Sequence, residues 1–217
     1  MKDIPIFTTE HGVASLILQE IPMQGCAYVR IQTTWEPEKM LEDCIGFCRM
    51  AGAREIYASG HGSLEAYPFH TALWEMCCFR NSLAETDAVL WPMQKDTAEA
   101  FRAIYNQKIC GIPNAAGLSK TEAARIADNG GGYFIHRNKE LLGIGIVEDS
   151  EIRFVASVRP GSGADIVCAL ACSIHQDKIT LQVASENRRA IALYERLGFL
   201  KTREISRWYC VFRELKG

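Results

Sequence analysis

The first 80 residues alternate between short apolar blocks, which are typical of strands, and one longer stretch with helical periodicity. The longer stretch, residues 37–50, repeats apolar side chains every three or four positions, starts at Pro37 and is followed by Gly52. Because proline fits the first turn of a helix and glycine takes the left-handed position after the last, we expect a helix over 37–50. The apolar blocks predict strands at 13–19, 27–32, 55–59 and 71–79.

A polar stretch at 81–87 separates this part from a second run of alternating strands and helices. Two predicted helices open with a capping-box pattern, namely Asp96-x-x-Glu99 and Ser119-x-x-Glu122. Further helices are expected at about 164–174 and 187–197. Strands are expected at 89–91, 133–136, 141–147, 152–158, 179–184, 200–205 and 207–213. Helices and strands alternate throughout, so the predicted fold class is α/β with a mixed sheet.

Two segments of nearly equal length, residues 27–60 and 152–184, repeat the order strand, helix, strand. A crossover of this kind implies that its two strands pair in parallel. A degenerate duplication and chance both explain the repetition, and the sequence leaves the choice open. The polar stretch at 81–87 is the predicted boundary, which gives one domain at 1–85 and a second at 88–217.

Composition narrows the class of protein. A chain of 217 residues with 48% apolar and 23% charged residues is ordinary for one large globular unit or two small ones. The formal net charge is −2, and proteins that bind nucleic acid usually carry a basic excess, so we expect no nucleic-acid partner. No apolar stretch approaches the roughly 18 residues of a membrane helix, and the opening residues lack a signal-peptide pattern.

Nine cysteines, an odd number that mostly falls inside apolar blocks, favour a reducing cytoplasm. Cys44 and Cys48, with His61, His70 and Cys77 further along, could be read as metal ligands. Structural zinc sites use close pairs such as Cys-x-x-Cys, which this chain lacks. We therefore expect these cysteines to pack in a core, and we expect no metal.

Residues 184–199, ASENRRAIALYERLGF, predict an amphipathic helix between two strands. Asn187 suits the N-cap because its side chain can accept a hydrogen bond from an amide of the first turn, and Gly198 suits the left-handed position after the last turn. Periodicity alone favours an ordinary packing helix. The identity of the residues indicates more.

Asn187, Ala190, Tyr194 and the pair Gly198-Phe199, preceded by the strand LQVA, resemble the C-terminal motif of the GCN5-related (GNAT) family of N-acetyltransferases. The order of elements over 88–213, which is 126 of the 217 residues, also resembles that family. The resemblance implies a GNAT acyl-CoA N-acyltransferase fold preceded by a smaller α/β half-domain. Residues 1–85 resemble half of the same fold without this motif, which implies a degenerate, non-catalytic GNAT-like half.

The resemblance also implies acetyl-CoA as co-substrate. In that family the strand matching 152–158 diverges from the strand matching 179–184, and pantetheine pairs with exposed backbone, here 154–158. Pyrophosphate binds amides at the start of the next helix, where free N–H groups and the helix dipole attract anions. Tyr194 would be the general acid for the leaving thiolate. The residues implied to bind the cofactor are Ala156, Ser157, Val158, Gly161, Gly163, Ala164, Asp165, Ile166 and Asn187.

The phosphate loop departs from the family pattern of Arg or Gln, two residues, Gly, one residue, and Gly or Ala. The preceding Val158-Arg159-Pro160 is kept. A gapless alignment puts Gly163 where the basic residue is expected, whereas a one-residue deletion puts it on the first glycine. We prefer the deletion because it keeps one helix face apolar. Either alignment brings the negative charge of Asp165 toward the expected pyrophosphate.

Several roles stay open. Arg159 or Arg188 would compensate the charge of the loop. The general base is unassigned, since Glu148, Asp149 and Glu151 lie in a suitable stretch but are better explained as a solvated hairpin turn. Four aromatic side chains of the N-terminal part either line an acceptor cleft or fill its core, and we favour the core: Trp35, Tyr67, Phe69 and Trp74.

The sequence therefore predicts a cytoplasmic N-acetyltransferase that moves an acetyl group from acetyl-CoA to a primary amine, in a small molecule or a peptide, by direct transfer in a ternary complex. The alternative is a non-catalytic binding or regulatory protein that keeps the GNAT scaffold and has lost CoA because of its altered loop. No membrane partner is expected. The acceptor and the oligomeric state, a homodimer included, are left open.

Overall fold

The computed structural model describes residues 5–110, 112 and 116–214. The opening residues, from which no signal peptide is expected, lie outside this range. The chain divides into two compact units that do not follow chain order. One unit holds Met1–Ala72 and Ile205–Gly217, and the other holds Leu73–Glu204. No helix within the described residues is both long and apolar enough to span a membrane.

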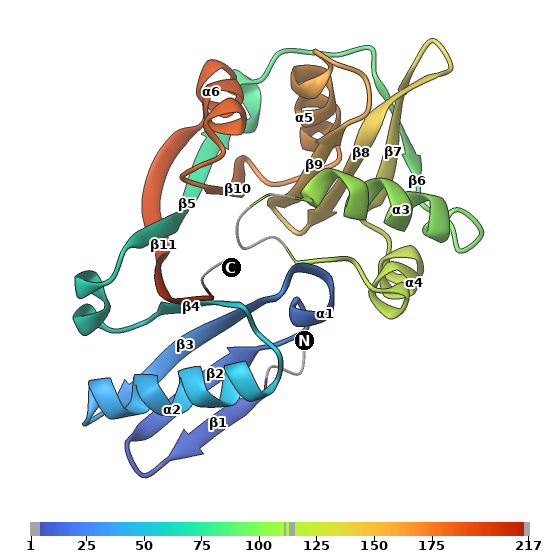
Figure 1. Cartoon of the computed structure of the whole chain (residues 1–217). Coiled ribbons are helices and arrows are strands. Elements are labelled where there is room, and N and C mark those ends of the chain that lie inside the picture. Colours follow the sequence, from blue (N-terminus) through green and yellow to red (C-terminus); the bar gives the residue numbers. More distant parts are fainter. Residues whose placement is uncertain (1–4, 111, 113–115, 215–217) are drawn as a thin grey trace. The chain divides into compact units, whose positions relative to one another are not determined.

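The first unit is a sheet with one long helix against it (Figure 1). The helix, α2 (Pro37–Met50), is the one predicted over 37–50, and it buries Met40, Leu41, Cys44 and Cys48. The strands lie in the order β1-β2-β3-β4-β11. Their bounds are Ile6–Thr9, Gly12–Ile17, Cys26–Thr34, Glu55–Ser59 and Leu200–Arg213, and short helical turns lie at Ile21–Gln24 (α1) and Gly62–Ala66 (η1).

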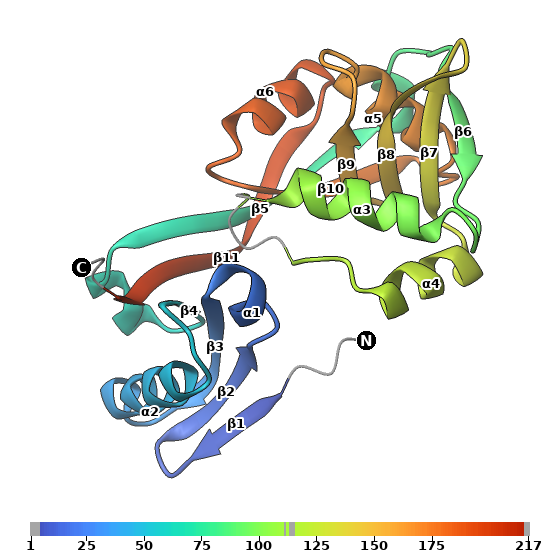
Figure 2. The same cartoon turned by 45° about the vertical axis from the view of Figure 1, so that its right-hand side comes forward.

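The second unit is a mixed sheet with strand order β5-β10-β9-β8-β7-β6. The strand bounds are Phe69–Phe79, Lys178–Ala184, Glu151–Ser157, Glu140–Glu148, Gly132–Arg137 and Val89–Pro92. The helices are α3 (Ala98–Ile109), α4 (Lys120–Asn129), α5 (Gly163–Cys172) and α6 (Arg188–Arg196), with a turn η2 at Arg80–Ser82. Figure 2 shows α3 and α4 on one side of strands β6 to β9 and α5 on the other.

Each unit pairs strands that lie far apart in the sequence. The last part of β11 pairs antiparallel with β4, with Tyr209 opposite Ala58. In the second unit β5 pairs antiparallel with β10, from Lys178 opposite Phe79 to Ala184 opposite Leu73. The strand β11 is continuous over Leu200–Arg213, so the prediction of separate strands at 200–205 and 207–213 is wrong. The functional division into 1–85 and 88–217 stays a prediction.

Two glycines of β8 allow α5 to lie close to the sheet. A Cβ at Gly143 would come within 2.5 Å of Ile166 Cδ1, and a Cβ at Gly145 within 2.3 Å of Leu170 Cδ1. The side chains of Ile166 and Leu170 are fully buried in the core between α5, α6 and the sheet. The helix that follows β9 is therefore held rigidly against β8.

The structure confirms one predicted capping box and rejects the other. The Ser119 side chain accepts a hydrogen bond from the amide of Glu122, whose carboxylate in turn accepts from the backbone of Ser119. At α3 the N-cap is Thr97 rather than Asp96, and no side-chain cap forms. The Glu99 carboxylate is instead held by Arg102 one turn later, which removes the second half of the box.

The packing of the predicted N-terminal aromatic residues also differs from expectation. Trp35 is 63% exposed, Phe69 49% and Tyr67 37%, so the prediction that they fill a core is wrong. Trp35 donates its indole N–H to the carbonyl of Glu10, which fixes the ring at the surface. Trp74 lies in the second unit, where it packs against the core formed with α5 and α6.

Candidate functional site

The neighbouring parallel strands β9 and β10 diverge after a short contact. They pair at only two positions, Thr180 opposite Glu151 and Leu181 opposite Ile152. The remaining three residues of β10, Gln182–Ala184, have no partner on β9 although β5 still pairs with them on the other side. A stretch of β9 therefore has one edge of its backbone unpaired.

The matching pair of strands in the first unit behaves differently. There β3 and β4 pair in parallel at all five residues of β4, from Cys26 opposite Glu55 to Arg30 opposite Ser59. The two strand–helix–strand segments thus share an order of elements but only the second one opens between its strands.

The hydrogen-bonding phase of β9 identifies the backbone groups at the open edge. The amide of Val158 donates to Leu142 O on β8, and Ala156 and Phe154 lie opposite Ile144 and Ile146 in the same phase. Because the backbone groups of successive strand residues point to alternate sides, those of Val155 and Ser157 point to the edge that faces β10. A shift of register at Arg153, which lies opposite no residue of β8 in the strand pairing, sets this phase.

The turn after β9 leads into α5, whose first amides are free. Ser162, the N-cap residue, is 5% exposed, and its hydroxyl contacts Ser157 Oγ at 2.8 Å and donates toward the carbonyls of Arg159 and Leu142. It therefore makes no cap hydrogen bond to the helix. Among the described residues, no acceptor binds the amides of Gly163, Ala164 and Asp165. These three N–H groups, with the helix dipole, suit an anion.

The other loop residues expected at the cofactor have distinct surroundings. Gly161 has a φ of +87° and open space where a side chain would be, so only its backbone borders the loop. Gly163 lies against α6, since a Cβ there would be 2.8 Å from Leu193 Cδ2. Ile166 is fully buried and its amide donates to Ser162 O, so neither its side chain nor its N–H faces the loop. Ala156 is buried on the side of α3 and α4, whereas Val158 is 40% exposed.

The charges around the loop are arranged in pairs. Asp165 Oδ1 lies 2.6 Å from Arg137 Nη2 on β7, so the carboxylate is not free beside the first amides of α5. Arg159 is engaged by Glu140. Arg188, exposed at the start of α6, has no ion pair among the described residues. Of the two arginines expected to compensate the loop, only Arg188 keeps an uncommitted charge.

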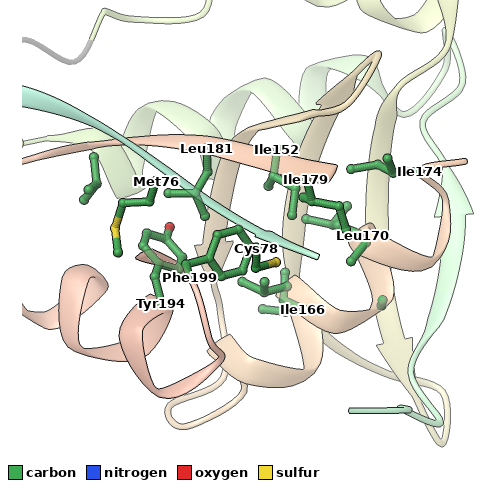
Figure 3. Packing of buried hydrophobic residues seen from close by; sticks show 14 of the residues in the cluster. Met76, Cys78, Ile152, Ile166, Leu170, Ile174, Ile179, Leu181, Tyr194 and Phe199 are labelled. Carbon is green, nitrogen blue, oxygen red and sulfur yellow. The ribbon is translucent and has the colours of Figure 1, made fainter. Parts of the chain in front are cut away.

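The helix α6 holds the two motif residues expected near the cofactor. Asn187 is the N-cap and its Oδ1 accepts from the amide of Ala190 at 3.2 Å, as its position in the sequence predicts. Tyr194 is 8% exposed and packs with Phe199 and Met76, and Figure 3 shows its hydroxyl directed to the side where Met76 and Leu181 lie. Burial raises the pKa of Tyr194 to about 12, so the phenol stays protonated at neutral pH.

The structure assigns no general base. Glu148 lies in an ion pair with Arg153, which lowers the pKa of Glu148 below its ordinary value. Asp149 has a left-handed φ of +53°, as expected at the tip of a tight hairpin. Glu151 occupies the first position of β9, opposite Thr180. The interpretation of this stretch as a solvated turn fits these surroundings.

Neither the candidate metal ligands nor the two cysteines of α2 form a reactive site in the described part of the chain. No group of three or more His, Cys, Asp or Glu side chains could hold a metal ion there. Cys44 and Cys48 are buried in the core beneath α2, where burial raises the pKa of Cys44 to about 12 and that of Cys48 to about 11. A buried thiol of this kind is unreactive.

The contacts of two residues at the site could not be predicted from the sequence. Arg137 follows His136 at the end of a predicted strand, a position typical of a surface residue, and nothing in the sequence indicates its contact with Asp165. Ser162 precedes a predicted helix, so a capping role is the natural expectation, yet its hydroxyl points back to the preceding turn. Both contacts depend on the tertiary fold.

Comparison with known proteins finds similarity in structure alone. No family model matches the sequence, and no curated protein matches it. The fold is similar to a functionally unknown conserved protein from Staphylococcus epidermidis ATCC 12228, at 12% identity and a TM-score of 0.63, over 99% of this chain and 96% of that one. A GCN5-related N-acetyltransferase from Anabaena variabilis matches at 12% identity and a TM-score of 0.60, over 92% of this chain and 59% of its own.

A tandem GNAT protein from the clavulanic acid biosynthesis pathway matches at 10% identity and a TM-score of 0.51, over 95% of this chain and 80% of its own. Identities this low show the fold alone. The chain has the GNAT fold, as the motif at 187–199 predicts, and the match to a tandem GNAT protein agrees with the GNAT-like half expected from residues 1–85. Similarity of fold does not identify the substrate of this chain.

Proposed function

We propose that the chain is an N-acetyltransferase that moves an acetyl group from acetyl-CoA to a primary amine by direct transfer in a ternary complex. The observation that carries the proposal is the divergence of β9 from β10 directly before the uncapped start of α5. The CoA thioester contains an extended pantetheine arm and a diphosphate. The open edge of β9 suits the arm, and the uncapped start of α5 suits the diphosphate.

The arm would extend the open edge of β9. The backbone groups of Val155 and Ser157 point to this edge and would pair with the amides of pantetheine, as an added strand does. The diphosphate would accept hydrogen bonds from the amides of Gly163 and Ala164, and Gly161 offers close approach because it carries no side chain. Asn187 would approach the cofactor from the start of α6.

The reaction needs one bond to form and one to break. The amine nitrogen attacks the thioester carbonyl, a C–N bond forms, and the C–S bond breaks. We assign Tyr194 the role of donating its proton to the departing thiolate, because burial keeps the phenol protonated at neutral pH. The proton lost by the amine goes to solvent or to a base that stays unassigned. The acceptor belongs to the class of small amines or peptides.

A reducing, cytoplasmic setting is part of this proposal, since all nine cysteines are free thiols. A nucleic-acid partner is not proposed, because the net charge of −2 offers no basic excess for phosphates.

A second candidate is a binding or regulatory protein that keeps the GNAT scaffold without CoA. Two observations favour it: the loop holds the carboxylate of Asp165 in the first turn of α5, and the carboxylate of Glu148 in the stretch at 148–151 is engaged by Arg153. Fold alone does not decide function, so the two candidates need a direct measurement.

Calorimetry with acetyl-CoA, paired with a Tyr194→Phe variant, separates the candidates. The enzyme predicts micromolar binding by the wild type, kept by Tyr194→Phe, together with a loss of turnover of about 10²-fold or more against a panel of amines. Tyr133→Phe is the matched control, because Tyr133 packs against the same core but is not part of the motif at 187–199. This variant should keep both acetyl-CoA binding and turnover. No heat of binding at millimolar acetyl-CoA would reject the enzyme.

A further inference from the structure

The first turn of α5 contains a negative side chain of its own. Asp165 occupies the third helical position, after Gly163 and Ala164. A carboxylate in the first turn is attracted by the same free N–H groups and the same dipole that would bind a phosphate. Asp165 is therefore a competitor for any anion at the start of this helix, and it also repels one.

Arg137, the last residue of β7, engages this carboxylate. Its Nη2 lies 2.6 Å from Asp165 Oδ1, and the two side chains are equally exposed, at 31%. The same guanidinium also lies near a second acid, with Nε 2.5 Å from Asp87 Oδ1, and Nη2 donates weakly to Thr86 Oγ1 at 3.5 Å. Nε makes no hydrogen bond at this contact, so the guanidinium attracts Asp87 by charge alone while it lies between Asp87 and Asp165.

We infer that Arg137 is a positioning residue of the proposed acetyl-CoA site, which holds the Asp165 carboxylate away from the first amides of α5 and leaves them to the diphosphate. The inference rests on the proposed function. It explains how a loop with an acid in its first turn remains compatible with an anionic ligand. Arg137 touches the helix residue and has no need to touch the ligand.

The test compares two acetyl donors that differ in the diphosphate. Acetyl-CoA carries it, and S-acetylpantetheine has the same arm and thioester without it. In an Arg137→Gln variant we expect the Kd for acetyl-CoA to rise about three- to tenfold, because a released carboxylate competes at the helix start. The Kd for S-acetylpantetheine should stay unchanged.

A second substitution separates positioning from general support of the fold. In an Asp165→Asn background the competing charge is gone, so Arg137→Gln should no longer weaken acetyl-CoA binding. Arg102→Gln is the matched control, since Arg102 is a half-buried arginine of α3 paired with Glu99, and it should leave both constants unchanged. Thermal unfolding of each variant shows that it folds.

Wild-type binding of acetyl-CoA combined with an unchanged Kd in Arg137→Gln would overturn this inference and leave the proposed function intact. An equal loss for both donors, or a loss that persists with Asp165→Asn, would also overturn it, because Arg137 would then act on the fold. Absence of acetyl-CoA binding by the wild type would reject the proposed function itself.

Discussion

The rings of Tyr194 and Phe199 pack at a centroid distance of 5.9 Å with their planes inclined at 56°. Phe199 is fully buried, so this contact fixes the ring of Tyr194. No described residue accepts a hydrogen bond from the Tyr194 hydroxyl. The pKa of Tyr194 rises to about 12 from burial alone. A phenol in this state is a proton donor and not a base.

The raised pKa of Tyr194 predicts how turnover depends on pH. Because the protonated phenol is the active form and its pKa lies near 12, turnover limited by Tyr194 should not fall as pH rises from 8 to 10. The folded pKa lies above the ordinary value of about 10, so Tyr194 stabilises the fold below that pH and the contribution is lost as pH rises toward 12. Steady-state rates across this range, compared with Tyr194→Phe, measure the effect. An alkaline loss near pH 9 that disappears in Tyr194→Phe would contradict it.

Gly143 is predicted to be the most sensitive glycine of the second sheet. An added Cβ would lie 2.1 Å from the carbonyl oxygen of Ala156 and 2.5 Å from Ile166 Cδ1, and the backbone oxygen cannot move without opening the β8–β9 pair. Gly143→Ala should lower the free energy of unfolding by about 1–3 kcal/mol or more, measured by urea denaturation.

Gly46 supplies the control for this substitution. It lies within α2, and no atom within 4 Å would meet its Cβ. Gly46→Ala should raise the free energy of unfolding by up to about 1 kcal/mol, because alanine is the better helix former. Equal effects at Gly143 and Gly46 would contradict the packing of α5 on β8.

Thiol labelling tests the burial of the cysteines. Cys110 and Cys172 are exposed, whereas Cys44, Cys48 and Cys78 are buried and burial raises the pKa of each above its ordinary value. A thiol-reactive dye followed by mass spectrometry should modify the exposed pair in the folded protein. The buried three should react only after denaturation, because the thiolate is the reactive form. Rapid labelling of Cys44 under native conditions would be the contrary result.

Much of the fold could be predicted because local signals agree with it. The helix at 37–50 and the strand at 55–59 have the predicted bounds, and Ser119 and Asn187 cap their helices as their spacing indicates. The pairing of β5 with β10 and of β11 with β4 could not be predicted, because pairing partners distant in sequence leave no mark on periodicity.

The site, too, has features that the sequence predicts and features that it does not. The position of Asn187 and Tyr194 on one helix follows from the motif, and the family resemblance indicates an opening between the strands. The neutralisation of Asp165 by Arg137 depends on which side chains the fold brings together, and the burial of Ile166 depends on how α5 packs against Gly143. Neither follows from the residues near 158–166 alone.

Amide hydrogen exchange, measured by NMR with and without acetyl-CoA, tests the central claim most directly. The amides of Val155 and Ser157 should exchange rapidly in the free protein and become protected at saturating acetyl-CoA, together with those of Gly163 and Ala164. The amide of Val158, which already donates to Leu142 O, should be protected in both states. Protection of Val155 and Ser157 without ligand, or no change at any of these amides on its addition, would contradict the account.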